Sequence, residues 1–75
     1  MQYDKNVVGM VIRRERKARG LSQEVLSGLA NIAATHLSMI ETGHKQANLE
    51  TVWKIALALD MKPSELLAMI ESKTK

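Results

Sequence analysis

The chain has 75 residues, no cysteine and a formal net charge of +3 at pH 7. This length fits one small domain, and the lack of cysteine excludes disulfides and thiolate metal sites and favours a reducing, cytoplasmic compartment. No apolar run reaches the roughly 18–20 residues that cross a membrane, and Met1–Asn6 is too polar for the start of a signal peptide, so no membrane contact is expected.

Basic residues gather near the start of the chain. Residues 1–20 contain six Lys or Arg against two Asp or Glu, whereas residues 21–50 contain one lysine against three glutamates. A solvated helix face would explain such a cluster. Binding to nucleic acid would also explain it, because clustered cations gain affinity by releasing counterions from phosphates. Composition alone leaves both explanations open.

The pattern of apolar residues and turn formers predicts five helices and no strand. The first helix covers about Asn6–Arg19 and ends at Gly20, a common C-terminal breaker. Ser22 is a strong N-cap for a second, short helix that ends near Ala30. Asn31, which follows it, tolerates the left-handed backbone of a tight turn.

Three further helices follow. The third spans about Ala34–Thr42 and ends at Gly43, while Asn48 caps the fourth helix and Pro63 suits the first turn of the fifth. The fourth helix has an apolar stripe at i, i+3, i+4 and i+7, formed by Val52, Ile55, Ala56 and Leu59. Five short helices joined by short loops predict a compact all-α domain.

Residues 23–42 carry the motif that points to function. Two short helices are joined by the turn at Asn31, and Ser27 is small where these helices would cross closely. Their shared apolar face is formed by Leu26, Ala30, Ile32, Leu37 and Ile40. This pattern is typical of a helix-turn-helix, whose second helix lies in the major groove of DNA.

Two longer runs make the similarity to a known family specific. They are IRRERKARGLSQEVLSGLANIAATHLSMIETG at 12–43 and NLETVWKIALALDMKPSELL at 48–67. Together they resemble the phage repressor/Cro (XRE-type) helix-turn-helix family. The resemblance implies an all-α, five-helix, lambda-repressor-like DNA-binding domain at about 7–70, with short flexible ends at 1–6 and 71–75.

The resemblance also implies roles for individual residues. The residues expected to contact DNA bases are Gln23, Ala34, Thr35, Ser38 and Met39. The residues expected to contact DNA phosphates are Arg16, Ser22, Gln23, His36, His44, Lys45 and Gln46. His36 is expected there because of its place on the third helix, and the others because of the resemblance. Arg16 and Glu41 match a family ion pair, for which a positioning role is expected because desolvation opposes the Coulomb gain.

Some positions depart from the family's pattern. Ala33 stands where Ser or Thr usually caps the third helix, and Asp60 replaces a common glycine but can adopt the same left-handed backbone. Glu15 replaces an apolar residue and is expected at the rim of the core or paired with a neighbouring arginine. The outward positions of the third helix hold no Arg, Asn or Gln for a two-bond base contact, so base recognition would use hydroxyls, methyl contacts and DNA shape.

The resulting hypothesis is a non-enzymatic transcriptional regulator, a repressor that binds double-stranded DNA at a palindromic operator as a homodimer. The fifth helix is the expected dimer interface, through Leu66, Met69 or Ile70. The alternative is an antitoxin or anti-repressor type of protein-interaction module on the same fold, with a protein partner. No catalytic group, metal or cofactor is expected, because the two histidines lack further ligands and no hydroxyl has a base beside it.

Overall fold

A computed structural model of the chain describes residues 2–74 and contains five helices. They are α1 (Lys5–Ala18), α2 (Gln23–Ala30), α3 (Ala34–Glu41), α4 (Leu49–Ala58) and α5 (Pro63–Lys73). No strand occurs within the described range, so the predicted all-α, five-helix class is confirmed. Among these helices, none combines the length and the apolar composition that a membrane crossing requires.

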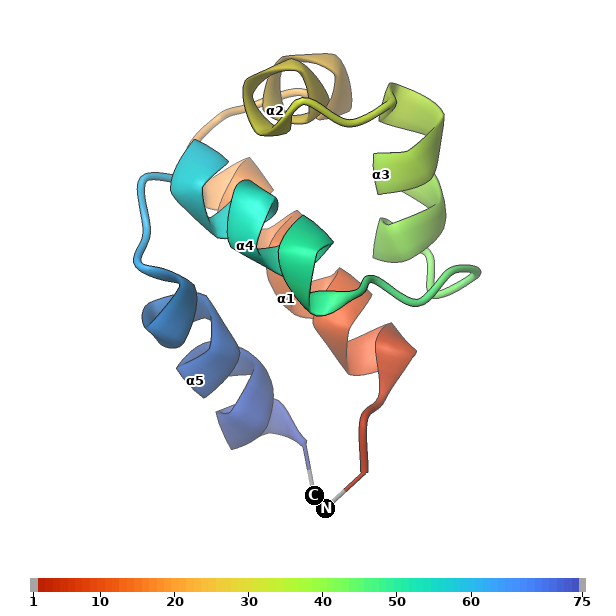
Figure 1. Cartoon of the computed structure of the whole chain (residues 1–75), viewed down its shortest axis with the longest axis vertical. Helices are drawn as coiled ribbons and strands as arrows, with labels where there is room; N and C mark the ends of the chain where they lie inside the picture. Colours follow the sequence, from red (N-terminus) through yellow and green to blue (C-terminus); the bar gives the residue numbers. More distant parts are fainter. Residues whose placement is uncertain (1, 75) are drawn as a thin grey trace.

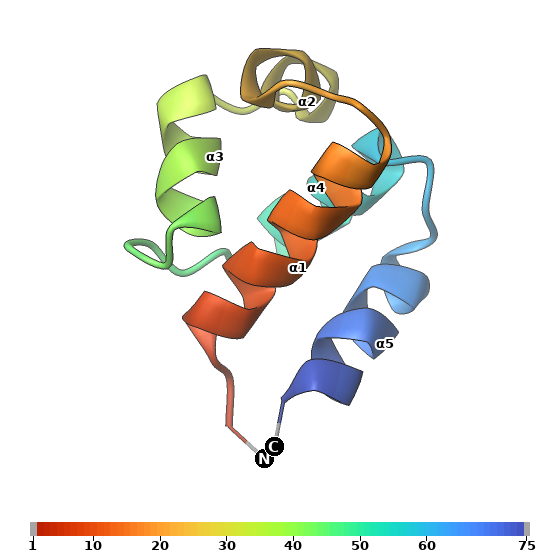
Figure 2. The ribbon, with the colours of Figure 1, turned by 180° about the vertical axis from the view of Figure 1, so that it is seen from behind.

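The helices are arranged so that α3 and α5 lie on opposite sides of the molecule (Figure 1). α3 packs against α1 and α2, α2 also packs against α4, and α5 packs against both α1 and α4. α4 faces the viewer in Figure 1, whereas α1 faces the viewer in Figure 2, which is drawn from behind. One side of α3 is thereby left without a neighbouring helix.

One cluster of buried apolar side chains fills the space between the helices. Its members are Val8, Val11, Ile12, Leu26, Ala30, Leu37, Ile40, Ala47, Val52, Ile55, Ala56, Leu59, Met61 and Leu66. The expectation that Leu66 faces a second copy of the chain is wrong, because this side chain is fully buried in the core. Its neighbour Leu67 is 39% exposed instead.

Side chains cap the helices at the predicted places. Ser22 and Asn48 each accept a hydrogen bond from a backbone N–H group of the first turn, at 3.1 and 2.8 Å. α1 begins one residue before its predicted start because Asp4 caps it, accepting from the N–H of Asn6 at 2.9 Å. Ala33 provides no side-chain cap for α3, as its departure from the family's pattern predicts.

Within residues 2–74, two residues other than glycine adopt a left-handed backbone. They are Asn31 after α2, with φ 57° and ψ 45°, and Asp60 after α4, with φ 59°. Asn and Asp reach this conformation more easily than other side chains because they are short and form local hydrogen bonds. Both turns therefore have the backbone that the sequence predicts.

The ends of the described chain take part in the fold. The predicted flexible ends covered residues 1–6 and 71–75, but α1 includes residues 5–6 and α5 continues to Lys73. Beyond α5, the Thr74 hydroxyl donates to the carbonyl of Ile70 at 2.8 Å. Residues 1 and 75 lie outside the described range.

α1 and α3 cross in direct backbone contact at Gly9. A Cβ atom at this position would meet the carbonyl oxygen of Ile40 and would lie 2.9 Å from the carbonyl oxygen of Glu41. Both oxygens belong to the backbone of α3, which cannot move aside as a flexible side chain can. Gly9 therefore determines how closely α3 approaches α1.

We predict that Gly9→Ala lowers the free energy of unfolding by about 1–3 kcal/mol, because the added methyl group overpacks this crossing. Gly28 in α2 is the matched control, since a Cβ atom there meets nothing within 4 Å. Gly28→Ala should raise the free energy of unfolding by about 0.5–1 kcal/mol through helix propensity alone. Urea denaturation measures both changes, and a Gly9→Ala variant as stable as the wild type would contradict the close approach.

Candidate nucleic-acid interface

Backbone hydrogen bonds hold the turn between α2 and α3. The N–H of Asn31 donates to the carbonyl of Gly28 at 3.2 Å, and the N–H of Ile32 donates to that of Ser27 at 2.9 Å. Ser27 is buried, and its hydroxyl donates to the carbonyl of Glu24 at 3.0 Å, so its small side chain is satisfied without occupying space between the helices. The apolar residues of the predicted motif lie in the core or pack against it. The two helices and their turn therefore form the predicted motif.

α3 buries one side and exposes the other. Leu37, Ile40 and Glu41 face the interior. The opposite side carries the side chains predicted to contact bases, which are Thr35 and Met39, both exposed, and Ala34 and Ser38, both partly exposed. His36 is also partly exposed. Because no other helix covers this side, these side chains are accessible to a macromolecule (Figures 1 and 2).

The loop from α3 to α4 brings three more of the predicted residues to the surface. His44, Lys45 and Gln46 are all exposed. The N–H groups of His44 and Lys45 both donate to the carbonyl of Met39, at 2.9 and 3.1 Å, and Ala47 is buried at the other end of the loop. The loop is therefore attached to the end of α3 and adds a lysine to the accessible side.

A buried ion pair joins α1 to the end of α3. Arg16 donates to Glu41 through two hydrogen bonds, Nε to Oε2 at 2.7 Å and Nη2 to Oε1 at 2.9 Å, and its Nη1 donates to the carbonyl of Leu21 at 2.8 Å. The side chains of Arg16 and Glu41 are 9% and 1% exposed. The hydrogen bond to Glu41 raises the pKa of Arg16 and outweighs the opposite effect of burial.

Gln23 binds the same carboxylate from the start of α2. Its Nε2 donates to Oε1 of Glu41 at 3.1 Å, so residues of α1, α2 and α3 meet at one side chain. The structure therefore does not bring Arg16 to a surface where it could bind a phosphate. Its guanidinium is buried and bonded to Glu41 and Leu21, which corrects the expected phosphate contact. Gln23 remains partly exposed beside the exposed Ser22.

The basic residues of α1 and its C-cap residue Arg19 differ in their surroundings. Arg16 and Arg19 are bonded within the molecule, Arg19 to the Glu15 carboxylate at 2.9 Å and to the carbonyl of Leu59 at 2.8 Å. Glu15 is thus paired with a neighbouring arginine, one of its two expected environments. Arg13, Arg14 and Lys17 instead line a shallow hollow on the outer face of α1, together with Met10. Internal bonds therefore account for part of the basic cluster near the start of the chain.

Two residues contribute to this region without having been predicted. Gly9 allows the α1–α3 crossing, and Tyr3 donates its hydroxyl to the carbonyl of Ala47 at 2.8 Å, at the end of the α3–α4 loop. A glycine inside an amphipathic helix is a usable sign of a close crossing, because glycine otherwise weakens the helix. The partner of Tyr3 is 44 positions away, so no local pattern points to this bond.

A protein-family model described as helix-turn-helix matches residues 12–66 of the chain. The chain belongs to this family. The match confirms the resemblance found in the sequence, and this helix-turn-helix domain is that of a sequence-specific DNA-binding transcriptional regulator. A comparison with curated proteins gave no match.

Solved structures similar to the helix-turn-helix domain include regulators from three bacteria. The restriction-modification controller protein C.AhdI from Aeromonas hydrophila is 36% identical, with a TM-score of 0.80, over 84% of this chain and 96% of that one. An HTH_3 family transcriptional regulator from Vibrio cholerae is 31% identical, with a TM-score of 0.81, over 87% of this chain and 36% of that one. The clp gene regulator ClgR from C. glutamicum is 19% identical, with a TM-score of 0.87, over 100% of this chain and 97% of that one. At this low identity, the similarity to ClgR supports only the shared fold.

We predict that Glu41→Leu lowers the free energy of unfolding by about 3–5 kcal/mol, because it leaves the Arg16 guanidinium buried without its partner. Arg16→Met combined with Glu41→Leu should recover most of this loss, since two apolar side chains of similar size need no ion pair. Urea denaturation of the two variants measures the difference. Equal losses in the single and double variants would show that the cost does not come from the unpaired charge.

Proposed function

We propose that this helix-turn-helix domain is a repressor that binds double-stranded DNA as a homodimer at a near-palindromic operator. The observation that carries the proposal is the two-sided α3, which is bound to α1 and α2 through Glu41 and exposes Thr35 and Met39 on its other side. A helix presented in this way fits the major groove, and two copies would enter successive grooves about 34 Å apart. The proposal includes a cytoplasmic location and a non-enzymatic role, with repression through occlusion of polymerase.

In the proposed complex, α3 reads base edges through short side chains. The hydroxyls of Thr35 and Ser38 can donate to or accept from bases, and the methyl groups of Ala34 and Thr35 and the flexible Met39 suit the thymine methyl group. Gln23 is a further candidate for a base contact through the amide oxygen that its bond to Glu41 leaves available. Since none of the α3 side chains can form a two-bond contact, part of the specificity would come from DNA shape.

Contacts to phosphates would lie on both sides of α3. Ser22 and Gln23 begin α2, where free backbone N–H groups and the helix dipole attract anions. On the other side lie the exposed residues of the α3–α4 loop, His44, Lys45 and Gln46. His36, partly exposed on α3, completes the proposed set. Such contacts would position α3 on the duplex without specifying sequence.

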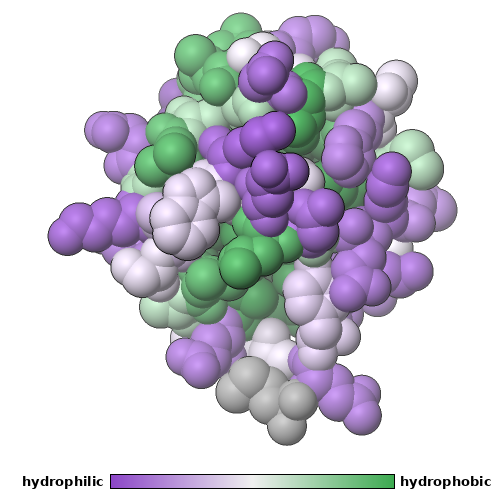
Figure 3. Space-filling model, in the orientation of Figure 1, coloured by the Kyte–Doolittle hydropathy of each residue, from purple (hydrophilic) through white to green (hydrophobic). Residues whose placement is uncertain are grey.

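Exposed apolar side chains on α4 and α5 support a homodimer through that side of the molecule. Trp53 and Leu57 on α4 and Leu67 and Met69 on α5 are all exposed, and Ile70 is partly buried next to the core. Figure 3, which has the α4 side toward the viewer, shows hydrophobic surface in the middle of this face with polar side chains around it. A second copy would bury this surface and double the number of phosphate contacts, so we propose an interface through Leu67 and Ile70, which line one groove. Met69, also expected at the interface from the sequence, lies two positions from Leu67 and therefore faces another side of α5.

A protein-interaction module of the antitoxin or anti-repressor type is the second candidate. It is favoured by the small, uncharged side chains at the outward positions of α3, which suit a protein surface as well as DNA. DNA binding through phosphates must weaken steeply as salt concentration rises, whereas protein docking on such a surface need not. Mobility shifts with duplex DNA at several salt concentrations therefore distinguish the two candidates.

We predict that Lys45→Ala weakens binding to every duplex and reduces the slope of log affinity against log salt by about 0.9 per protomer, or about 1.8 for the proposed dimer, because each protomer loses one phosphate contact. Thr35→Ala should instead change the preferred base at one position of each half-site. Fluorescence anisotropy titrations measure the slope, and selection of bound sites from random DNA measures base preference, palindromy and half-site spacing together.

Lys62→Ala is the matched control for the lysine variant, because Lys62 is exposed in the α4–α5 loop, far from the α3–α4 loop (Figure 1). Its affinity and salt slope should equal those of the wild type. If the Lys45 and Thr35 variants behave alike in both measurements, the proposed orientation on DNA is wrong.

A further inference from the structure

The segment before α1 and the first turn of α1 contact the α3–α4 loop from outside. The Tyr3 hydroxyl donates to the carbonyl of Ala47 at 2.8 Å, across 44 positions of the chain. At the other end of the loop, a Cβ atom on Gly43 would collide with the side chain of Asn6, so Asn6 lies directly against the backbone there. Residues 3–6 therefore contact both ends of the segment that carries His44, Lys45 and Gln46.

The loop has few other attachments. The N–H groups of His44 and Lys45 donate to the carbonyl of Met39, which ties the first half of the loop to α3. In the second half of the loop, Ala47 accepts a hydrogen bond from Tyr3, which is distant in sequence, and its methyl group packs into the core. The position of Lys45 thus depends on two anchors, one on each side.

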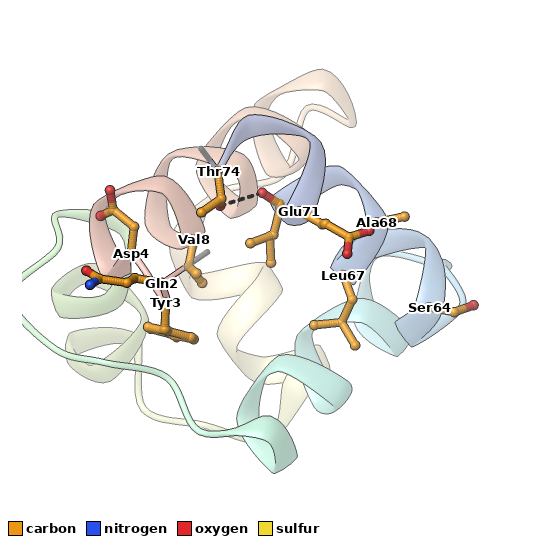
Figure 4. A pocket seen from close by; sticks show the side chains of 10 residues that line it. Gln2, Tyr3, Asp4, Val8, Ser64, Leu67, Ala68, Glu71 and Thr74 are labelled. Carbon is orange, nitrogen blue, oxygen red and sulfur yellow. Dashed lines mark hydrogen bonds between the residues drawn. The ribbon is translucent and has the colours of Figure 1, made fainter.

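The Tyr3 side chain is 52% exposed and forms part of the wall of an apolar groove of about 520 Å³ between the N-terminal segment and α5. Val8, Leu67 and Ile70 also line this groove, which Figure 4 shows from close by. Burial raises the pKa of the Tyr3 hydroxyl above its ordinary value. The hydroxyl therefore remains a protonated donor at neutral pH.

We propose that Tyr3 is a positioning residue for DNA binding, whose hydrogen bond to Ala47 holds residues 44–46, and with them the Lys45 ammonium group, at the DNA phosphate. The inference rests on the proposed function, because it needs the α3–α4 loop to contact DNA. A loop that is already held in its bound position loses less conformational entropy when it binds. Tyr3 thus affects affinity although it lies outside the helix-turn-helix and touches no DNA.

Tyr3→Phe tests the inference, since it keeps the aromatic ring and removes only the hydrogen-bond donor to Ala47. Binding to a mixed-sequence duplex at low salt should weaken about two- to tenfold, the range for one lost hydrogen bond. The slope of log affinity against log salt should also fall, by up to about 0.9 per protomer, although no charge has been removed, because Lys45 no longer stays at its phosphate. A substitution that only reduced global stability would leave the slope of log affinity against log salt, measured for the folded protein, unchanged.

Thr74→Val is the control, because it removes another hydroxyl that donates to a carbonyl at this end of the molecule but lies outside the loop. Its affinity and slope should equal those of the wild type. The double variant with Lys45→Ala completes a cycle, in which Tyr3→Phe should change affinity less than about twofold once Lys45 is absent. Additive effects, or a Tyr3→Phe variant with wild-type affinity and slope, would overturn the inference.

Hydrogen exchange in the free protein separates this inference from the proposed function. Tyr3→Phe should speed exchange of the amides of residues 44–47 relative to those of α5, whether or not DNA is present. Faster exchange together with wild-type DNA binding in Lys45→Ala would mean that Tyr3 holds the loop but that Lys45 does not contact DNA. This result would refute the role of Tyr3 in DNA binding and the proposed Lys45 contact, while the base contacts of α3 would stand or fall by the Thr35→Ala result. Unchanged exchange together with weaker DNA binding in Lys45→Ala would refute only the role of Tyr3.

Discussion

The Arg16–Glu41 ion pair is the interaction on which the placement of α3 depends. Glu41 is the last residue of α3, and its carboxylate accepts hydrogen bonds from Arg16 of α1 and from Gln23 of α2. Three helices are thereby bound to one buried side chain. Close by, Gly9 lets the backbone of α1 contact that of α3, and this backbone contact sets the distance between the two helices. The ion pair then sets the angle between them.

This arrangement stabilises an orientation more than it stabilises the fold. Two buried charges lose their hydration, and the Coulomb energy and hydrogen bonds that they gain do little more than restore it. The apolar core, by contrast, is continuous through all five helices and supplies the driving force for folding. The ion pair therefore has its main effect on the direction in which the outer side of α3 faces, which is the property that a DNA-reading helix needs.

Much of this arrangement could be predicted from local chemistry. Ser22 and Asn48 cap helices because their side-chain oxygens reach free N–H groups, and Asn31 and Asp60 form left-handed turns, all as their residue types indicate. The predicted interface role of Leu66 is wrong because α5 has apolar residues on more than one face. Periodicity in so short a helix does not show which of two adjacent leucines enters the core. Tyr3 could not be predicted, since its bond joins segments that only the folded chain brings together.

The central claim is that the exposed side of α3 meets the edges of base pairs while its buried side stays bound to α1 and α2. The most direct test is to follow the backbone amide signals of the 15N-labelled domain by NMR while duplex DNA is added at low ionic strength. The account predicts that the signals of Thr35, Ser38 and Met39 and those of residues 44–46 shift first and furthest. Undisturbed α3 signals, with shifts absent or confined to α4 and α5, would contradict it.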